Sequence, residues 1–487
     1  MNLPLQIDRG DPIPLQDQLF EQLRQLILAG TLKPNSRVVA TRFLADQIGV
    51  SRTTVLLAYE RLISEGYLEA RPAVGTFVCS TLPEQGAPRY SRVEPPDVLR
   101  QASLRPPAFH SSTLAPPAVP KETIDFSATR FDVTYLLPTK LWVQGVRNLF
   151  AQEPDGLGRP LPAGGVMELR RAIVDYVAAT RGIMASPEQV IIVSGRRQAY
   201  GLVAHLFQRP GDRVVVGSPG DEDVVSFFNA RSAQLVHVPV DEHGLDTGSL
   251  PGGAASMAYV VPTNHTPLGG TMPLSRRNEL IEWARGARAY IIEDDSGSEF
   301  RYHKTTPPPL ATLDPYGLVF HVGSFATTLG TGLGLGYLIA PSEFVENIVA
   351  IKSMAEDGRP WLGQMFVANL LTGRGYDHHL RRVRKIYLER RDCLIGALQA
   401  HFGKVRLIGT EVGTQFAWVL PERFGSAQAV CDSAAAYGVK VECVANAYGS
   451  SPESWRYHDR ALVFGYAGLP VEQLRAGVSR LASSLSN

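Results

Sequence analysis

Residues 42–61, RFLADQIGVSRTTVLLAYER, decide how the first part of this chain folds. The pattern predicts two short helices joined by a tight corner. Gly49 ends the first helix, where a left-handed residue is needed, and Ser51 is a good N-cap for the second. Such an element is either a helical hairpin in a core or a DNA-binding unit, and the stretch alone leaves both interpretations open. The expected apolar faces are Leu44, Ala45 and Ile48 in the first helix and Val55, Ala58, Tyr59 and Leu62 in the second.

The start of the second helix carries the residues that would meet DNA, because a recognition helix presents its N-terminal end to base edges and phosphates. The flanking sequences favour this interpretation. An amphipathic helix is expected over residues 14–30, and two short β runs at 66–70 and 75–78 form a candidate wing. We therefore predict a winged-helix domain that binds double-stranded DNA. Its candidate contacts at the helix start are Ser51, Arg52, Thr53 and Thr54.

Length and composition bound the class of protein. A chain of 487 residues exceeds one ordinary domain, and 44% apolar with 20% charged residues is normal for a soluble globular protein. No run approaches the roughly 20 apolar residues that span a bilayer, and no signal peptide is visible, so we expect a cytoplasmic protein without a membrane segment. The four cysteines show no Cys-x-x-Cys spacing, so no metal site is expected. With a net charge of +1, any DNA affinity must come from clustered arginines.

The pattern along the chain predicts three segments. They are a winged-helix head over residues 1–79, a proline-rich linker over 80–123 that is either semi-extended or disordered, and a body over 124–487. In the body, helices alternate with continuous apolar strand runs, which predicts an α/β fold with a mostly parallel sheet covered on both faces. A smaller α+β part follows from about residue 360. Polar residues at the carboxyl ends of the strands mark the expected pocket.

Residues 10–78 closely resemble the DNA-binding domain of GntR-type regulators. The segments PLQDQLFEQLRQLILAGTLKPNSR, LADQIGVSRTTV, AYERLISEGYLEA and GTFV follow the order and spacing of that family. The resemblance implies that Arg42 and Arg52 are the main DNA contacts and that Gly75 lies at the wing tip. One departure is Val38-Val39-Ala40, where the family has Leu-Pro-Ser. The change weakens the start of the next helix and removes one small hydroxyl contact to phosphate.

The body resembles fold-type I aminotransferases in the version fused behind a GntR head, the MocR/GabR class of bacterial regulators. The matching segments run in the family's order from about residue 155 to 395, and they include PAGGVMELRRAIVDYVAATRGI, PEQVIIVSG, YIIEDD and GSFATTLGTGLGLGYLIAP. The resemblance implies a cytoplasmic bacterial transcription regulator that forms a homodimer. Each head is then expected to pack on the partner's body, and the two heads to bind two half-sites.

That family holds pyridoxal phosphate as a Schiff base on the lysine of Ser-Lys-x-x-x-Pro-x-x-Arg-x-Gly. In this sequence the lysine position is Thr327, which has no amine and cannot form the imine. Ala326 and Gly334 replace the hydroxyl and the arginine that would hold the phosphate. Ser296 stands where the family has the tyrosine that contacts the ring oxygen. Asp221 stands where the family has an aromatic residue near the ring.

Other positions of the cofactor site differ as well. The family's His-Gln pair is Asn264-His265 here. Only Asp294, the expected partner of the pyridinium nitrogen, matches outright, and a buried aspartate can instead accept hydrogen bonds from backbone N–H groups. The nearest lysines, Lys304 and Lys352, do not match the motif.

A ligand site is still expected in this pocket. Ser194 and Gly195 open a helix whose free N–H groups favour an anion. Arg196 and Arg197 follow, and two arginines suit the carboxylate or phosphate group of an anionic effector. The alternative is that both arginines point into solvent. The candidate residues of this vestigial pocket are Gly195, Arg196, Asn264, Asp294 and Thr327.

These observations predict a DNA-binding transcription regulator with no catalytic residue and no covalently held cofactor. Its body is expected to dimerise and is a candidate sensor of a small molecule. Two alternatives stay open. One is a regulator that binds pyridoxal phosphate noncovalently, which Asp294 would support, and the other is an active aminotransferase, which Thr327 opposes.

Overall fold

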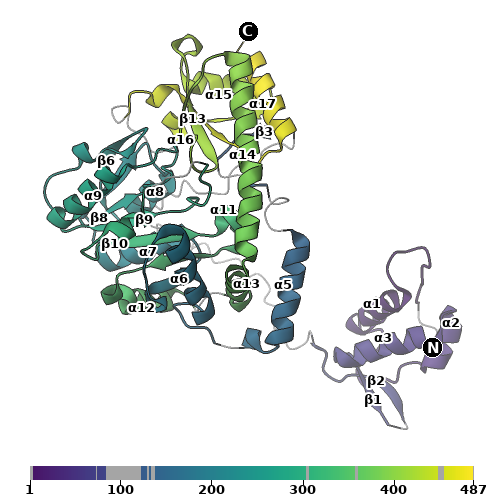
Figure 1. Cartoon of the computed structure of the whole chain (residues 1–487). Coiled ribbons are helices and arrows are strands. Elements are labelled where there is room, and N and C mark those ends of the chain that lie inside the picture. The colour runs from purple at the N-terminus through teal and green to yellow at the C-terminus, as the bar shows by residue number, and fades with distance from the viewer. Residues whose placement is uncertain are drawn as a thin grey trace, which may run out of the picture. The chain divides into compact units, whose positions relative to one another are not determined.

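The computed structural model describes residues 4–72, 74–83, 122–128, 131–132, 138–158, 160–302, 307–356, 360–447 and 455–485. The chain divides into two compact units, residues 1–106 (the head) and 107–487 (the body) (Figure 1). Of the predicted linker over 80–123, only residues 80–83 and 122–123 belong to the described ranges. No helix within these ranges combines the length and apolar character that crossing a membrane requires.

The head contains the predicted helices and wing. Helix α1 (Leu15–Leu28) precedes α2 (Thr41–Ile48) and α3 (Arg52–Ser64), and strands β1 (Leu68–Arg71) and β2 (Gly75–Val78) form an antiparallel hairpin. Gly49 ends α2 with a φ of 69°, in the left-handed region that glycine adopts without strain. The Ser51 hydroxyl accepts a hydrogen bond from the Thr54 amide at 3.1 Å, so it caps α3 as predicted.

The head has its own core, which fixes the orientation of α3. Val55, Ala58, Tyr59 and Leu62 are all buried, as their helical spacing predicted. The Tyr59 hydroxyl also donates to the Val39 carbonyl at 2.8 Å and ties α3 to the segment before α2. Ala40 is the N-cap of α2 and provides no side-chain hydrogen bond, as expected from Val38-Val39-Ala40. Leu82 packs into the same core.

An eight-stranded sheet forms the centre of the body, in the order β4-β11-β10-β9-β8-β5-β6-β7. Strands β6, β5, β8, β9 and β10 are parallel, while β11 runs antiparallel to β10 and β4, and β7 runs antiparallel to β6. The mostly parallel sheet predicted from the sequence is therefore confirmed. The bounds are β4 (Val190–Val193), β5 (Arg213–Ser218), β6 (Gln234–Asp241), β7 (Gly244–Leu245), β8 (Met257–Val260), β9 (Tyr290–Asp294), β10 (Val319–Ser324) and β11 (Gly336–Ile339).

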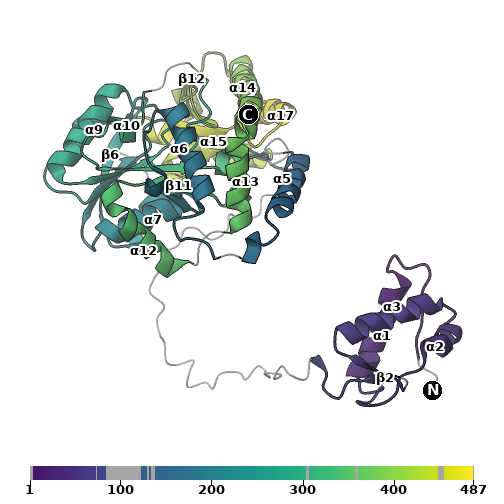
Figure 2. The ribbon, with the colours of Figure 1, turned by 60° about the horizontal axis from the view of Figure 1, so that its bottom comes forward.

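Helices cover both faces of this sheet because successive side chains of each strand point to opposite sides (Figures 1 and 2). Val214 and Val216 pack in one cluster with α7 (Arg196–Phe207), α8 (Glu222–Ala230) and α12 (Val345–Ala355). Val215 packs on the other face with α9 (Leu274–Ala287). Ile192 also packs on that other face, with α6 (Met167–Arg181) and α13 (Trp361–Thr372).

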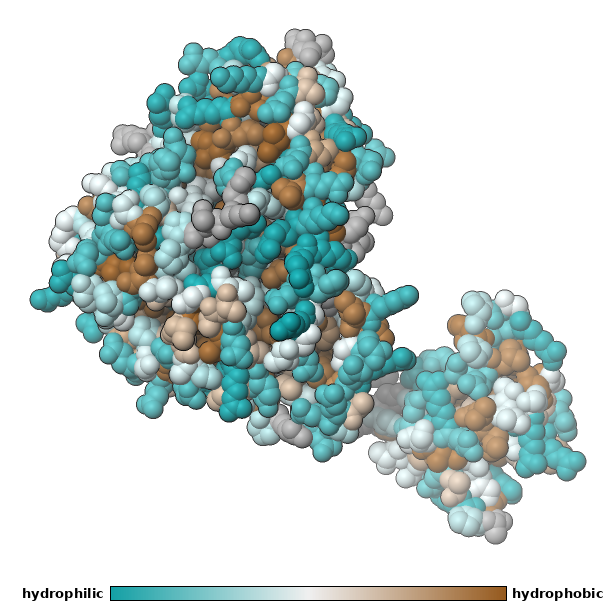
Figure 3. Space-filling model, in the orientation of Figure 1, coloured by the Kyte–Doolittle hydropathy of each residue, from teal (hydrophilic) through white to brown (hydrophobic). Residues whose placement is uncertain are grey.

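The C-terminal part is the predicted α+β unit. Its four-stranded antiparallel sheet has the order β12-β13-β16-β15, with bounds β12 (Arg406–Ile408), β13 (Gln415–Val419), β15 (Glu442–Cys443) and β16 (Ala461–Gly465). The long helix α14 (Gly375–Phe402) runs from beside α13 to this unit, where it packs against α17 (Val471–Ser484) (Figure 1). The body face shown in Figure 3 is mostly hydrophilic, and its hydrophobic residues form a few separate patches.

Candidate functional site

The first candidate site is the exposed N-terminal end of α3 in the head. Arg52 and Thr53 are exposed and Thr54 is half-buried. The Ser51 hydroxyl lies 2.8 Å from the Thr54 hydroxyl and also accepts from the Thr54 amide. Ser51 and Thr54 therefore shape the helix start, while Arg52 and Thr53 are the side chains that it presents to a partner.

Three exposed arginines of the head, Arg37, Arg42 and Arg52, have no acidic partner among the residues that the structure describes. Arg24, Arg61 and Arg71 are paired with carboxylates, as Arg24 is with Glu21 at 2.9 Å, and Arg9 donates to the Gly49 carbonyl. Free guanidinium groups suit phosphates and guanine edges. Arg42 lies in the first turn of α2, whose N-cap offers no side-chain acceptor, so the amides there also suit a phosphate.

Sequence reasoning missed Arg37. The residue forms an antiparallel bridge with Phe77, so its segment joins the edge of the wing. Gly75 has a φ of +132°, and a Cβ atom at this position would lie 2.7 Å from Arg37 Nε. Glycine at position 75 therefore allows the Arg37 guanidinium to lie against β2. The sequence alone does not reveal this contact, because it depends on the pairing of Arg37 with Phe77.

The second candidate site is a cavity of about 610 Å³ in the body. It lies where β4, β5, β8, β9 and β10 end, which is the usual ligand position in a parallel sheet. All five residues of the predicted vestigial pocket line it, namely Gly195, Arg196, Asn264, Asp294 and Thr327. Asp221, Ser296, Ala326 and Gly334 line it too. The structure thus brings together residues that are up to 139 positions apart in the chain.

Carboxylates hold both arginines that follow Gly195. Arg196 forms an ion pair with Asp221, and its Nη1 lies 3.7 Å from Asp294 Oδ2. Arg197 forms an ion pair with Asp223. The Arg197 side chain is 59% exposed and the Arg196 side chain 32% exposed, so only Arg197 points mainly to solvent. The two guanidinium groups are therefore paired within the chain, while the N-terminal end of α7 directly after Gly195, the other basis for expecting an anionic effector, also lies at the cavity.

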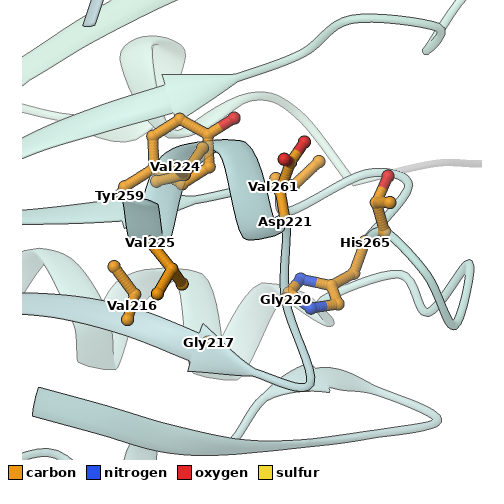
Figure 4. Close-up of a pocket in the computed structure, with 10 residues that line it drawn as sticks. Val216, Gly217, Gly220, Asp221, Val224, Val225, Tyr259, Val261 and His265 are labelled. Carbon is orange, nitrogen blue, oxygen red and sulfur yellow. The ribbon is translucent and has the colours of Figure 1, made fainter. Parts of the chain in front are cut away.

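Asp294 has partners for both of its oxygens. Oδ1 accepts from the Ser296 amide at 2.9 Å, and Oδ2 accepts from the Tyr259 hydroxyl. Burial and the neighbouring Asp294 carboxylate raise the pKa of Tyr259 well above its usual range, so the phenol stays a donor. Sequence reasoning missed Tyr259, which lies in the apolar run of β8. Figure 4 shows Tyr259, Asp221 and His265 among the residues that line a smaller adjoining cavity, with Asp221 between the other two in this view.

His265 is a structural group rather than a titrating one. Its Nε2 lies 2.8 Å from the Pro219 carbonyl and donates to it. Burial lowers the pKa of His265, which favours the neutral ring. The ring also fills the space beside Gly217, where a Cβ atom would lie 2.8 Å from His265 Cε1. His265 therefore fixes the turn that carries Asp221.

Three buried oxygens at the second site, Asn264 Oδ1, Ser296 Oγ and Thr327 Oγ1, have no hydrogen-bond partner among the described residues. A Cβ atom on Gly297 would lie 3.6 Å from Asn264 Nδ2 and 3.9 Å from Thr327 Cγ2, so Asn264 and Thr327 flank the backbone next to Ser296. Buried polar atoms are normally satisfied, so each of these three oxygens is an exception within the wall of the second site.

None of the described residues that line the cavity is a lysine. Lys352 is buried, donates to the Ala163 carbonyl at 2.6 Å and pairs with Glu356. Glu356 accepts in turn from the amide of Gln198, which lines the cavity, at 2.9 Å. Lys352 therefore supports the cavity wall from behind. Lys304 lies outside the described residues.

Comparison with known proteins agrees with this two-part organisation. Residues 15–78 match the family model described as bacterial regulatory proteins of the gntR family. The chain is 28% identical to the probable rhizopine catabolism regulatory protein MocR of Rhizobium meliloti, over 99% of this chain and 95% of that protein. It is also 28% identical to the HTH-type pyridoxine biosynthesis transcriptional regulator PdxR of Corynebacterium glutamicum, over 100% and 99% respectively.

Among solved structures, the body is similar to LysN, the alpha-aminoadipate aminotransferase of Thermus thermophilus. The TM-score is 0.66 with 25% sequence identity, and the match covers 75% of this chain and 92% of that one. The chain thus combines a GntR-type winged helix with an aminotransferase-like fold, which confirms the predicted fold class.

Proposed function

We propose that this chain is a bacterial transcription regulator, acting in the cytoplasm, that binds double-stranded DNA through its head and a small molecule through its body. The observation that carries the proposal is the start of α3, which Ser51 caps and which presents Arg52. Arg42 and Arg37 lie on the preceding segments, and neither has an acidic partner in the described ranges. The GntR-family match and the two regulators of similar length support it. Two heads on one homodimer would bind two half-sites.

Exposed apolar side chains support a dimer formed through the body. Helix α5 (Thr139–Gln152) exposes Leu141 by 52% and Val143 by 49%, and Leu157 in the following turn is 67% exposed. We take these exposed side chains as candidate contacts of the dimer, although Leu141 and Val143, two positions apart in a helix, lie on different sides of α5. We further propose that each head packs on the partner's body, which the 38 residues between 83 and 122 are long enough to permit.

The cavity does not suit pyridoxal phosphate held as an imine, and we propose that the regulator works without Schiff-base chemistry. Thr327 offers a hydroxyl where the imine needs an amine. Ala326 and Gly334 offer no side-chain donor to a phosphate. Asp294, the group that would hold a pyridinium nitrogen, is already bound by Tyr259 and Ser296 and faces Arg196. The same contacts weaken the alternative of noncovalent cofactor binding, and Thr327 argues against an active aminotransferase.

Selection of binding sites from random duplex DNA tests the regulator function directly. The full chain should enrich one sequence with two related half-sites at a fixed spacing, because the heads of a symmetric dimer contact DNA twice. The selection should be repeated in the presence of candidate ligands to detect an effector. Failure to enrich any sequence at moderate ionic strength would contradict the proposed function.

A further inference from the structure

We propose that Leu56, one turn along α3 from Arg52, contacts the 5-methyl group of a thymine in the major groove and so helps to determine which DNA sequence the head binds. Thymine is distinguished from the other DNA bases in this groove by that methyl group. The inference rests on the proposed function, because it concerns the same DNA-binding end of α3. It adds one base that the half-site should contain.

Two leucines of α3 remain in solvent although the rest of its large apolar residues are in the core. Leu56 is 43% exposed and Leu57 is 44% exposed, whereas Val55 and Tyr59 on either side are buried. Single exposed leucines are common on protein surfaces, so exposure alone assigns no role to either side chain. The position of each leucine on the helix separates the two.

Leu56 lies on the face of α3 that carries Arg52 and Thr53. It follows Arg52 by four positions and Thr53 by three, and side chains at both spacings are neighbours on a helix surface. Thr53 is exposed, and Arg52 has no acidic partner among the described residues. This face therefore combines an unpaired guanidinium group with an apolar group. The edge of the major groove offers matching partners, because base acceptors and phosphates lie there beside thymine methyl groups.

Leu57 belongs to another side of the helix. It precedes Arg61 by four positions, so these two side chains are neighbours. Arg61 pairs with Asp17 of α1 at 2.9 Å, and its guanidinium carbon lies 4.0 Å from the centre of the Phe20 ring, also in α1. The side of α3 that carries Arg61 is therefore directed toward α1. Leu57 has nearly the same exposure as Leu56 but lies beside this side, which makes it a matched comparison.

The dimensions of the helix and the groove permit contacts by Arg52 and Leu56 at the same time. Four residues advance a helix by about 6 Å, and the major groove, about 12 Å wide, admits a helix. Successive base pairs are about 3.4 Å apart, so we expect the thymine within about two base pairs of the base nearest Arg52. Glu60, one further turn along, is exposed and acidic, so the DNA contact is expected to end at Leu56.

Replacing thymine by uracil tests the proposal without changing the protein, because deoxyuridine lacks only the 5-methyl group. In the duplex that the full chain selects, each pair of symmetry-related thymines is replaced in turn, and equilibrium binding is measured at fixed salt. Replacement of one such pair should weaken binding about fourfold for each half-site, as expected for the loss of one buried methyl group. Equal affinity for the selected duplex and for a duplex with uracil at every thymine position would overturn the proposal.

Matched variants assign the methyl contact to Leu56. In Leu56→Ala the preference for thymine over uracil should disappear at that position, because the protein side of the contact has been removed. Leu57→Ala removes the same side chain from the next position and should keep the preference. Alanine favours the helix, so both variants are expected to keep the fold. A thymine preference that persists in Leu56→Ala, or that is lost only in Leu57→Ala, would contradict the assignment.

The same measurements separate this inference from the proposed function. A full chain that enriches no duplex would refute both. Tight binding to a selected duplex without any effect of uracil would refute the role of Leu56 alone. A changed sedimentation mass of Leu56→Ala together with an unchanged thymine preference would instead assign this leucine to a contact between protein chains, and would equally overturn the proposal.

Discussion

Asp294 Oδ2 lies 3.7 Å from Arg196 Nη1, so the carboxylate at the end of β9 faces a guanidinium group of the same chain. Helix α7 supplies this guanidinium from the position directly after Gly195. An aspartate that is stabilised in this way needs no bound pyridinium. The carboxylate that would hold the pyridinium nitrogen of the cofactor therefore already has a cationic partner in the protein.

Pyridoxal phosphate should form no imine with this protein. Thr327 supplies no amine. Lys352 is buried, donates to the Ala163 carbonyl and pairs with Glu356. We expect a colourless purified protein and no imine absorption band after the cofactor is added. The check is borohydride reduction followed by peptide mass spectrometry, with a working aminotransferase as the positive control. A reduced adduct on Lys304, Lys352 or any other lysine would contradict this prediction, because it would show that the body binds the cofactor as an imine on that lysine.

The body alone should remain dimeric, while the isolated head should be monomeric and bind DNA weakly. Joining two weak DNA contacts in one dimer raises the effective concentration of the second, which the isolated head lacks. Each unit has its own core, so both fragments are expected to fold. Sedimentation of fragments 1–83 and 122–487 measures their masses directly. A monomeric body at micromolar concentration would exclude the proposed architecture.

Glu299 should make the stability of the body depend on pH. Burial raises the pKa of Glu299 from 4.5 to about 7, and its Oε2 has no partner among the described residues. As pH rises, the Glu299 carboxyl ionises first in the unfolded chain. The free energy of unfolding that its protonated form contributes below about pH 4.5 is therefore lost between pH 4.5 and about 7. The loss is at most roughly 3 kcal/mol. The titratable groups that face Glu299 are Asp295, Arg181, Arg301, Tyr176, Tyr337 and Tyr376.

Glu299→Gln should therefore flatten this pH dependence and stabilise the body above neutral pH. Thermal unfolding followed across this pH range measures the effect. Glu389→Gln, at an exposed position in the middle of α14, is the matched control and should follow the parent. An unchanged profile in Glu299→Gln would show that this carboxyl is ionised in the folded state at neutral pH.

Local sequence signals predicted the elements, and the family resemblance predicted the residues of the cavity. Ser51, Gly49 and the spacing of Val55 and Tyr59 depend on neighbours within one or two helical turns, so the helix–turn–helix was readable. Asp294 and Thr327 were placed in one pocket by the resemblance to fold-type I aminotransferases, which is consistent with the convergence of the carboxyl ends of parallel strands.

Contacts between distant segments could not be predicted in this way. The pairing of Arg196 with Asp221 depends on how α7 and α8 approach each other on one face of the sheet. The same holds for Tyr259 with Asp294 and for Arg37 with Gly75, which join elements 35 and 38 residues apart. Because such contacts set the charge of a site, the sequence could locate the cavity without revealing its preference for a ligand.

The central claim is that the head binds specific DNA through arginines that no acidic side chain of the described head neutralises, and equilibrium binding to the selected duplex at fixed salt tests it most directly. Arg52→Ala and Arg42→Ala should each weaken binding by about 1–3 kcal/mol, and Arg52→Ala should also relax sequence preference if Arg52 contacts a base. Arg24→Ala removes the same charge from the head, but Arg24 is already paired with Glu21, so this control should bind nearly as the parent does. If the folded Arg52→Ala protein bound the duplex as tightly as the parent and the control, the assignment of α3 as the recognition helix would be wrong.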